Sequence, residues 1–309
     1  MVRFAVLDVG SNTVNLLVVD AHRGSAPVPV HSERMDLRLA EHITRDGRIG
    51  KRAIDGLNRI VRAASVRSKD LNSDEFLALA TSAIREATNG REVISQVRSE
   101  TGVRLTVLPG RDEAVLTFLA VRRWYGWSSG RLLVADIGGG SVELAIGSGE
   151  QPDHAISIPL GAGRMFREFF ADDPPKGAQV RALRSHVRDA LEAVASEYEG
   201  KSVQHAVGTS KTFRQLARLA SRFAGRSEPG EERLLYVDEL NDLCARLVKM
   251  DVKQRAELPR ISESRAPQIA AGALVAAEIM ETLSIDVLEV CPWALREGII
   301  LRRLDMLKD

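Results

Sequence analysis

Two short segments of the chain combine a carboxylate, glycines and hydroxyls in the same order. The first is residues 5–20, AVLDVGSNTVNLLVVD, and the second is residues 133–147, LVADIGGGSVELAIG. They align without a gap, so that Asp8 falls on Asp136. The other matching pairs are Gly10 with Gly138, Thr13 with Ser141, Val14 with Val142, and Leu16 with Leu144. Each copy has the pattern of a β-hairpin, with an apolar run ending in Asp, a tight glycine turn and a second apolar run. The repetition indicates a duplicated domain.

Turns of this composition can hold a phosphate. Glycine lets the backbone approach an anion closely, so that consecutive N–H groups point at one oxygen. The turns supply Gly10, Gly138, Gly139 and Gly140 for this purpose, with side-chain donors from Ser11, Asn12, Thr13 and Ser141. An Asp beside a phosphate makes sense if it binds a divalent cation that bridges to the phosphate oxygens. Two facing loops would then clamp a chain of phosphates. A plain hairpin turn with a capping Asp is the alternative for either copy alone.

A second acid accompanies the second turn. Glu143 stands where the first copy has Asn15, so the duplicated segments differ at that point. A carboxylate beside the glycine loop suits a metal or water ligand. A solvated strand residue is the alternative interpretation.

Two further segments offer phosphate donors. ATSAIREA, residues 80–87, follows a predicted strand and supplies Arg85, which can form bidentate bonds to phosphate. GTSKTFR, residues 208–214, places Thr209, Ser210 and Lys211 just before an amphipathic helix, whose N-terminus can hold an anion. It lacks the GxxxxGK[ST] spacing of a Walker loop, so this signal is weak by itself.

A pair of acids supplies candidate bases. Asp112 and Glu113 lie in the first turn of a predicted helix. Either can deprotonate a water for attack on a terminal phosphorus, or both can simply favour the helix dipole. The histidines offer no competing base, since none of them shows HExxH or other paired spacing: His22, His31, His42, His154, His186 and His205. Neither Cys244 nor Cys291 stands in a CxxC context, which favours core packing for both.

The elements that must position these residues alternate along the chain. Helical periodicity predicts helices at 53–66, 93–98, 111–125, 180–198, 211–223, 237–250, 266–283 and 295–306, and strands are predicted at 76–80, 103–108 and 286–290. Strands alternating with helices indicate the α/β class. A segment rich in Gly, Pro and charge, residues 225–232, predicts a surface loop. The domain boundary is expected at 126–130, dividing the chain into domains 1–126 and 127–295.

Composition restricts the function classes. The 309 residues include 43 Lys and Arg against 42 Asp and Glu, so the net charge of +1 gives no sign of nucleic-acid binding. The longest apolar stretches, such as 269–275, fall well short of the ~20 residues of a membrane span. No secretion signal precedes the first strand, and two cysteines cannot form a disulfide framework. We therefore expect a soluble cytoplasmic protein with neither a nucleic acid nor a membrane as partner.

The combined motifs resemble those of a known family. DVGSNT, ATSAIREA, PGRDEA, DIGGGSVEL, GTSKTF and CPWALREG occur in the order found in the exopolyphosphatase and guanosine pentaphosphate phosphohydrolase (Ppx/GppA) family. The resemblance extends from Val6 to about Leu304. It implies two α/β domains of the ribonuclease-H-like type, as in actin, Hsp70 and sugar kinases, with a cleft between them. It also implies that a helix of about 296–309 returns to the first domain.

The resemblance assigns roles to residues. Glu113 is implied as the catalytic base, and Asp136 and Glu143 as catalytic residues that, with Asp8, surround Mg²⁺ or a similar ion such as Mn²⁺. Successive phosphates would be held by Ser11, Asn12, Thr13, Arg85, Gly138, Gly139, Gly140, Ser141, Thr209, Ser210 and Lys211. Members of the family often dimerise, which implies a homodimer. Two departures are an Asp at position 112, where the family commonly has Glu, and the absence of a helical C-terminal extension, which suggests a preference for short polyphosphates.

Four functions are open on this basis. The first is release of terminal orthophosphate from inorganic polyphosphate by metal-assisted in-line attack of water. The second is removal of the 5′ γ-phosphate of guanosine pentaphosphate. Several basic residues could bind either substrate, or could simply be solvated surface residues: Arg164, Arg167, Arg214 and Arg265. A kinase of the same superfold and a non-catalytic phosphate sensor are less favoured alternatives.

Overall fold

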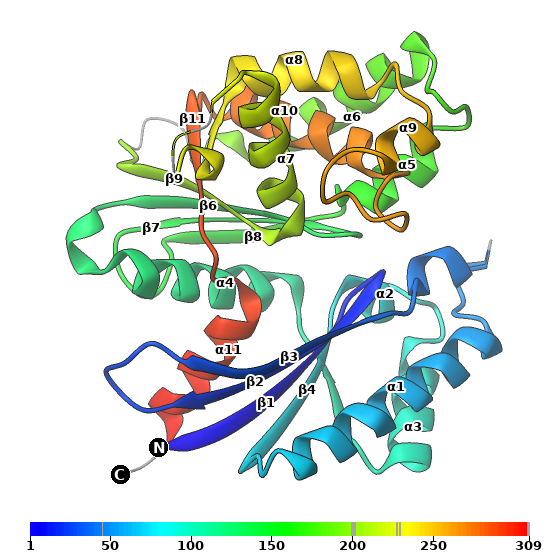
Figure 1. Ribbon diagram of the computed structural model, residues 1–309, viewed down its shortest axis with the longest axis vertical. Helices are drawn as coiled ribbons and strands as arrows, with labels where there is room; N and C mark the ends of the chain where they lie inside the picture. Colours follow the sequence, from blue (N-terminus) through cyan, green and yellow to red (C-terminus); the bar gives the residue numbers. More distant parts are fainter. Residues whose placement is uncertain (45, 199–201, 227, 229, 308–309) are drawn as a thin grey trace. The chain divides into compact units, whose positions relative to one another are not determined.

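The chain folds into two compact units. The computed structural model describes residues 1–44, 46–198, 202–226, 228 and 230–307. Unit 1 consists of Met1–Leu116 and Leu295–Asp309, and unit 2 of Thr117–Ala294. Each unit is built on one mixed sheet (Figure 1).

Unit 1 contains a five-stranded sheet in the order β3-β2-β1-β4-β5. The strands are β1 (Val2–Val9), β2 (Thr13–Ala21), β3 (Val28–Asp36), β4 (Glu75–Ala80) and β5 (Leu105–Val107). Strands β1 to β3 are antiparallel neighbours, whereas β4 and β5 run parallel to β1. Successive side chains of β1 point to opposite faces, and both faces are buried, which explains why this strand is almost continuously apolar.

Helices cover both faces of this sheet. Figure 1 shows α1 (Lys51–Asp70) and α3 (Gly90–Thr101) on one face, where α1 buries residues at helical spacing from Ala53 to Ser68. Helix α11 (Leu295–Met306) packs on the other face against Phe4 and Val6. The short helices η1 (Leu39–His42) and α2 (Ser82–Arg85) lie between these elements along the chain.

Unit 2 contains a six-stranded sheet in the order β10-β11-β9-β6-β7-β8. The strands are β6 (Leu132–Ile137), β7 (Val142–Gly147), β8 (His154–Ile158), β9 (His205–Thr209), β10 (Leu234–Tyr236) and β11 (Val287–Val290). The helices are α5 (Ala162–Phe169), α6 (Gly177–Ala195), α7 (Ser210–Phe223), α8 (Val237–Leu247), α9 (Val252–Ala256) and α10 (Ile269–Thr282), with 3₁₀ turns η2 (Trp127–Ser129) and η3 (Glu231–Arg233).

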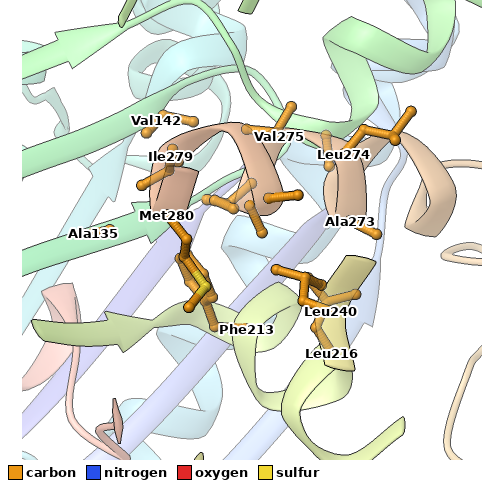
Figure 2. Packing of buried hydrophobic residues seen from close by; sticks show 14 of the residues in the cluster. Ala135, Val142, Phe213, Leu216, Leu240, Ala273, Leu274, Val275, Ile279 and Met280 are labelled. Atoms are coloured by element: carbon orange, nitrogen blue, oxygen red, sulfur yellow. The ribbon is translucent and has the colours of Figure 1, made fainter. Parts of the chain in front are cut away.

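Helix α10 forms the centre of the largest hydrophobic core. Every residue from Ile269 to Met280 is buried, so the helix is apolar around most of its circumference. Figure 2 shows its side chains beside Phe213 and Leu216 of α7 and Leu240 of α8. This packing fixes α7, whose first residues belong to the candidate site.

The two sheets repeat one topology, which confirms the duplicated α/β fold. Three antiparallel strands are followed by parallel additions in both units, as β3-β2-β1-β4-β5 and as β8-β7-β6-β9-β11. The registers also correspond, since Asp8 pairs with Asn15 and Asp136 pairs with Glu143 across the first hairpin of each sheet. Residues directly opposed in an antiparallel pair lie on the same face of the sheet.

The division between the units falls inside helix α4 (Gly110–Tyr125), earlier than the predicted boundary at 126–130. The second half of α4 packs on the β6-β7 face of unit 2 through Phe118 and Val121. Contacts of the helix, which periodicity does not reveal, therefore decide where the boundary lies. No helix of the described residues is long and apolar enough to cross a bilayer.

Helix α11 belongs to unit 1, and Arg23 holds its end. The Arg23 guanidinium donates to the carbonyl oxygens of Leu304 and Asp305, each at 3.4 Å, and to that of Leu307. The predicted helix of about 296–309 is observed at Leu295–Met306, and residues 308–309 lie outside the described residues. The predicted loop at 225–232 includes positions 227 and 229, which also lie outside them.

Candidate active site

Three turns of unit 1 meet at the carboxyl ends of parallel strands. Val9 of β1, Ala80 of β4 and Val107 of β5 are aligned with one another across the sheet. The N–H of Thr81 donates to the carbonyl oxygen of Val9 at 3.2 Å, and that of Leu108 donates to Ala80 at 3.0 Å. The carboxyl end of such a sheet is the usual position of a ligand site in α/β proteins. The Gly10 turn, the start of α2 and the start of α4 are thereby brought together.

Glu113 is paired with Arg85 at this end of the sheet. Nη1 of Arg85 lies 3.1 Å from Oε2 of Glu113 and donates also to the carbonyl oxygen of Leu108 at 3.1 Å. The side chains are 20% and 14% exposed, so the ion pair is partly shielded from water. Sequence reasoning placed Arg85 among the phosphate ligands and did not foresee this pairing. The contact fixes the direction of the Glu113 carboxylate.

A buried side-chain contact of Ser11 holds the Gly10 turn in place. Oγ of Ser11 lies 3.0 Å from Oγ of Ser82 in a buried contact that joins the first turn to α2. The backbone carbonyl of Asn12 accepts from the N–H groups of Leu37 and Arg38, at 3.1 and 2.8 Å. Thr13 begins β2, and its carbonyl accepts from the N–H of Gly10 at 3.0 Å. In this structure the Ser11 hydroxyl therefore stabilises the turn.

The second turn repeats the geometry of the first. The N–H of Gly138 donates to the carbonyl of Ser141 at 2.9 Å, as Gly10 does to Thr13. Two acids lie beside this turn, since Asp136 and Glu143 are directly opposed on β6 and β7. They share the sheet face that carries Leu132 and Val134.

Hydroxyl groups orient both of these acids. Oγ1 of Thr209 donates to Oδ2 of Asp136, and Oγ of Ser157 donates to Oε1 of Glu143 at 2.7 Å. Glu143 is only 3% exposed. Because each carboxylate has one oxygen fixed by a hydroxyl, the pair is oriented before any ligand arrives.

The electrostatics of Asp136 reflect competing effects. Burial raises the pKa of Asp136 above its ordinary value, because a charged carboxylate loses hydration there. The Thr209 hydrogen bond and the charges of Arg214 and Arg265 act in the opposite direction. The two arginines, which the sequence named only as general basic residues, are thus close enough to influence this acid. Their position follows from the packing of α7 and of the segment before α10.

The segment 208–211 adopts an unusual backbone. Ser210 has φ of 73°, a left-handed conformation that is uncommon for a residue other than glycine. Its hydroxyl is buried and has no hydrogen-bond partner among the described residues. Lys211 follows as the second residue of α7. Strained, unsatisfied groups of this kind concentrate at functional sites.

The acids fit a divalent cation of the Mg²⁺ type. Among the described residues no group of three or more His, Cys, Asp or Glu forms a preassembled metal site. Mg²⁺ is commonly held by one or two carboxylates together with water and substrate phosphates. Asp136 and Glu143, hard oxygen donors on one face, match that requirement. Asp8 occupies the corresponding position of unit 1.

The predicted residues thus form two sets. The set in unit 1 is Asp8, Ser11, Asn12, Thr13, Arg85 and Glu113, and the set in unit 2 is Asp136, Gly138, Gly139, Gly140, Ser141, Glu143, Thr209, Ser210 and Lys211. Sequence reasoning named Arg164 and Arg167 only as general basic residues and did not predict α5, whose first residues hold the Gly138–Gly140 backbone. The glycines at 161 and 163 were the available signal.

Comparison with known proteins gives a consistent result. Residues 17–307 match the model of the Ppx/GppA phosphatase family. The chain is 51% identical over 308 residues to Exopolyphosphatase 1 of Mycobacterium leprae, covering 99% of this chain and 91% of the relative. Exopolyphosphatase 1 of Mycobacterium tuberculosis is also 51% identical, with 99% and 90% covered.

Solved structures agree with this assignment. A crystal structure of an exopolyphosphatase from Cytophaga hutchinsonii is 25% identical, with a TM-score of 0.88 and 99% of both chains covered. The Aquifex aeolicus PPX-GPPA enzyme is also 25% identical, with a TM-score of 0.79 and with 97% of this chain and 99% of that chain covered.

Proposed function

The chain belongs to the Ppx/GppA phosphatase family and is a hydrolase, and on that premise we propose that it is an exopolyphosphatase. Its substrate would be inorganic polyphosphate, from which it removes the terminal orthophosphate. The observation that carries the proposal is the duplicated turn. In each unit a strand that carries an acid, Asp8 or Asp136, is followed by a turn with glycine N–H groups. A substrate made only of linked phosphates needs repeated anion donors.

Glu113 is the proposed catalytic base. A water positioned by its carboxylate attacks the terminal phosphorus in line with the bridging oxygen, and Glu113 accepts the proton. The bond between that phosphorus and the bridging oxygen breaks. Orthophosphate leaves with one oxygen from water, and the remaining chain keeps the bridging oxygen. Arg85 holds the Glu113 carboxylate in a fixed direction, which favours this geometry.

The phosphate groups would be held by backbone N–H groups and hydroxyls. Consecutive N–H groups at Gly139, Gly140 and Ser141 are suited to a phosphate oxygen. The N-terminus of α7, with Lys211 in its first turn, offers a second anion position. The charges of Arg214 and Arg265 support a further negative group near Asp136.

A divalent cation is the proposed cofactor. Asp136 and Glu143 would hold it in unit 2, with Asp8 as the corresponding acid of unit 1. Mg²⁺ or Mn²⁺ would neutralise charge that develops on the phosphate oxygens. Thr209 and Ser157 keep the two acids of unit 2 oriented for that purpose.

Phosphate release from tripolyphosphate tests the proposal. We expect release by the wild-type protein that requires Mg²⁺ and falls by about 10²–10⁴-fold in Glu113→Gln, since removal of a general base has that effect. Asp112→Asn is the matched control, because Asp112 is the exposed neighbouring acid in the same turn. An equal loss in both variants would contradict the assignment of the base.

The substrate is tested in the same assay. Polyphosphate and guanosine pentaphosphate are compared at equal Mg²⁺, and clearly faster release from the nucleotide would overturn the choice of polyphosphate. Reaction in ¹⁸O-labelled water should place one label in the released phosphate, whereas transfer of the phosphate to an acceptor would indicate a kinase. We also propose a homodimer, which a solution mass near 33.8 kDa would contradict.

A further inference from the structure

We propose that the segment Gly161–Arg164, at the start of α5, is a positioning element for the phosphate loop of unit 2. It would aim the N–H groups of Gly139, Gly140 and Ser141 at the substrate, with Gly161 as the residue that makes the close approach possible. The inference rests on the proposed function, because it assigns this loop to phosphate binding. In this role the segment acts through the loop that it holds.

Four hydrogen bonds join the segment to the loop. The N–H of Ala162 donates to the carbonyl of Gly138 at 3.0 Å, and that of Arg164 donates to Gly139 at 2.9 Å. The carbonyl of Gly140 accepts twice, from the N–H of Gly161 at 3.2 Å and from Nε of Arg164 at 3.0 Å. All the carbonyls of the glycine run are therefore bound to the first turn of one helix.

These bonds determine where the loop's N–H groups point. In a trans peptide the C=O of one residue and the N–H of the next are directed oppositely. Because the carbonyls of residues 138, 139 and 140 face α5, the N–H groups of residues 139, 140 and 141 face away from it. Three N–H groups on one side of a loop form a concave anion site. Preorganised donors of this kind need no rearrangement when charge develops on the substrate.

Gly161 is required because there is no room for a side chain at this position, and its backbone conformation does not itself require glycine. Its φ of −61° and ψ of 148° are accessible to any residue. A Cβ at this position would, however, overlap the main-chain atoms of Gly140 and Ser141. These atoms belong to the loop itself, so they cannot yield without moving the N–H groups. A side chain at 161 would push the loop away from α5.

The corresponding turn of unit 1 is held less extensively. After β3, the N–H groups of Leu37 and Arg38 both donate to one carbonyl, that of Asn12. After β8, the chain donates to three successive carbonyls. In both units the chain after the third strand of the hairpin sheet therefore holds the first turn. In unit 2 it does so through more hydrogen bonds. This difference points to the unit 2 loop as the one that needs fixed donors.

Gly161→Ala and Gly50→Ala form a matched pair of variants. Gly50 is the N-cap of α1 with φ of −70° and ψ of 153°, nearly the conformation of Gly161. A Cβ at Gly50 would meet its nearest atom, the carbonyl oxygen of His42, at an ordinary 3.6 Å. We expect Gly161→Ala to lower kcat/KM for tripolyphosphate about 100-fold, the effect of misplacing reacting groups by about 1 Å. Gly50→Ala should remain within about twofold of wild type.

A second variant keeps the proposal testable if Gly161→Ala does not fold. Arg164→Lys retains the charge and loses the Nε donor to Gly140, so kcat/KM should fall about fivefold, the value of one hydrogen bond. Val187→Ala, which truncates a buried residue of α6, serves as a control for general destabilisation of unit 2. A loss in Arg164→Lys that matches Val187→Ala at equal Tm would overturn the proposal, as would a Gly161→Ala variant that behaves like Gly50→Ala.

Direct binding separates this inference from the proposed function. The dissociation constant for inorganic phosphate in the presence of Mg²⁺, measured by calorimetry, should rise in Gly161→Ala and stay unchanged in Gly50→Ala. If the wild-type protein binds phosphate but hydrolyses no polyphosphate, the proposed function fails, and this comparison still decides the role of Gly161. Unchanged phosphate binding in folded Gly161→Ala would reject that role.

Discussion

Gly298 of α11 lies directly against the carbonyl oxygen of Leu116 in α4, so closely that no Cβ fits between them. Both residues stand near the points where the chain passes from one unit to the other, at Leu116–Thr117 and at Ala294–Leu295. Two helices can approach to backbone contact only where a residue without a side chain lies at the crossing. Gly298, the last residue of the CPWALREG segment, is therefore a packing residue.

Replacing Gly298 should destabilise the protein. Gly→Ala inside a helix normally stabilises it by about 1 kcal/mol, but overpacking at a close contact costs about 1–3 kcal/mol. Gly298→Ala should consequently lower the Tm measured by a thermal scan. Gly56→Ala in α1 is the control, because its Cβ would meet only side-chain ends, those of Leu37 at 3.1 Å and of Arg59 at 3.8 Å. An increase in Tm for both variants would contradict the packing role.

Arg85 should matter for the rate more than for stability. Arg85→Met removes the contacts of Nη1 with Glu113 and with the Leu108 carbonyl, so the carboxylate loses its fixed direction. We expect kcat/KM for tripolyphosphate to fall about 100-fold. Arg111→Met, at an exposed position in the first turn of α4, should leave the rate within about twofold of wild type. Equal rates for the two variants would exclude the orienting role.

Asp136 should reduce stability when no metal is present. Burial raises its pKa in the folded protein above the 3.8 of the free side chain, so the unfolded chain ionises first as pH rises. The folded protein therefore loses stability as pH rises above the range in which the free side chain ionises. With EDTA at pH 7.5, Asp136→Asn should be more stable by about 0.5–2 kcal/mol and inactive.

Metal binding should reverse that difference. A cation that binds only the folded wild-type protein raises its Tm by mass action, and the Asn variant should gain much less. Thermal scans of both proteins with EDTA and with Mg²⁺ give the comparison. A lower Tm for Asp136→Asn already in EDTA would show that the carboxylate is not a net cost.

Because its thiol is buried, Cys244 should lower the stability of the folded protein at alkaline pH. Burial raises the pKa of the Cys244 thiol from 9.0 to about 12, so the folded state keeps its proton while the unfolded state loses it. Stability should fall as pH rises from 9 towards 12, at about 1.4 kcal/mol per unit. Urea unfolding of the wild type and of Cys244→Ala at pH 8 and pH 10 measures this contribution. A pH dependence unchanged by the substitution would contradict it.

The hairpins of both units could be predicted because their signal is local. Alternating apolar runs around glycine turns specify β1-β2 and β6-β7. The duplication was visible because the two segments align without a gap, with Asp8 on Asp136. Helices such as α1 and α7 were predictable from their spacing of apolar residues. Strand β3 was missed because it lies at the sheet edge, where most of its side chains are exposed and no apolar run is required.

The sequence by itself determined which side chains end the strands, since Asp, Gly and hydroxyl residues stand at fixed distances along the chain. The tertiary structure decided which side chains and backbone groups are hydrogen-bonded to one another. Arg85 with Glu113, Thr209 with Asp136, and Gly161 with Gly140 each join residues that are far apart in sequence. Such contacts depend on strand order and on helix packing, which local periodicity does not encode. For that reason the chemistry was readable from the sequence, whereas the orientation of the carboxylates and of the loop N–H groups required the fold.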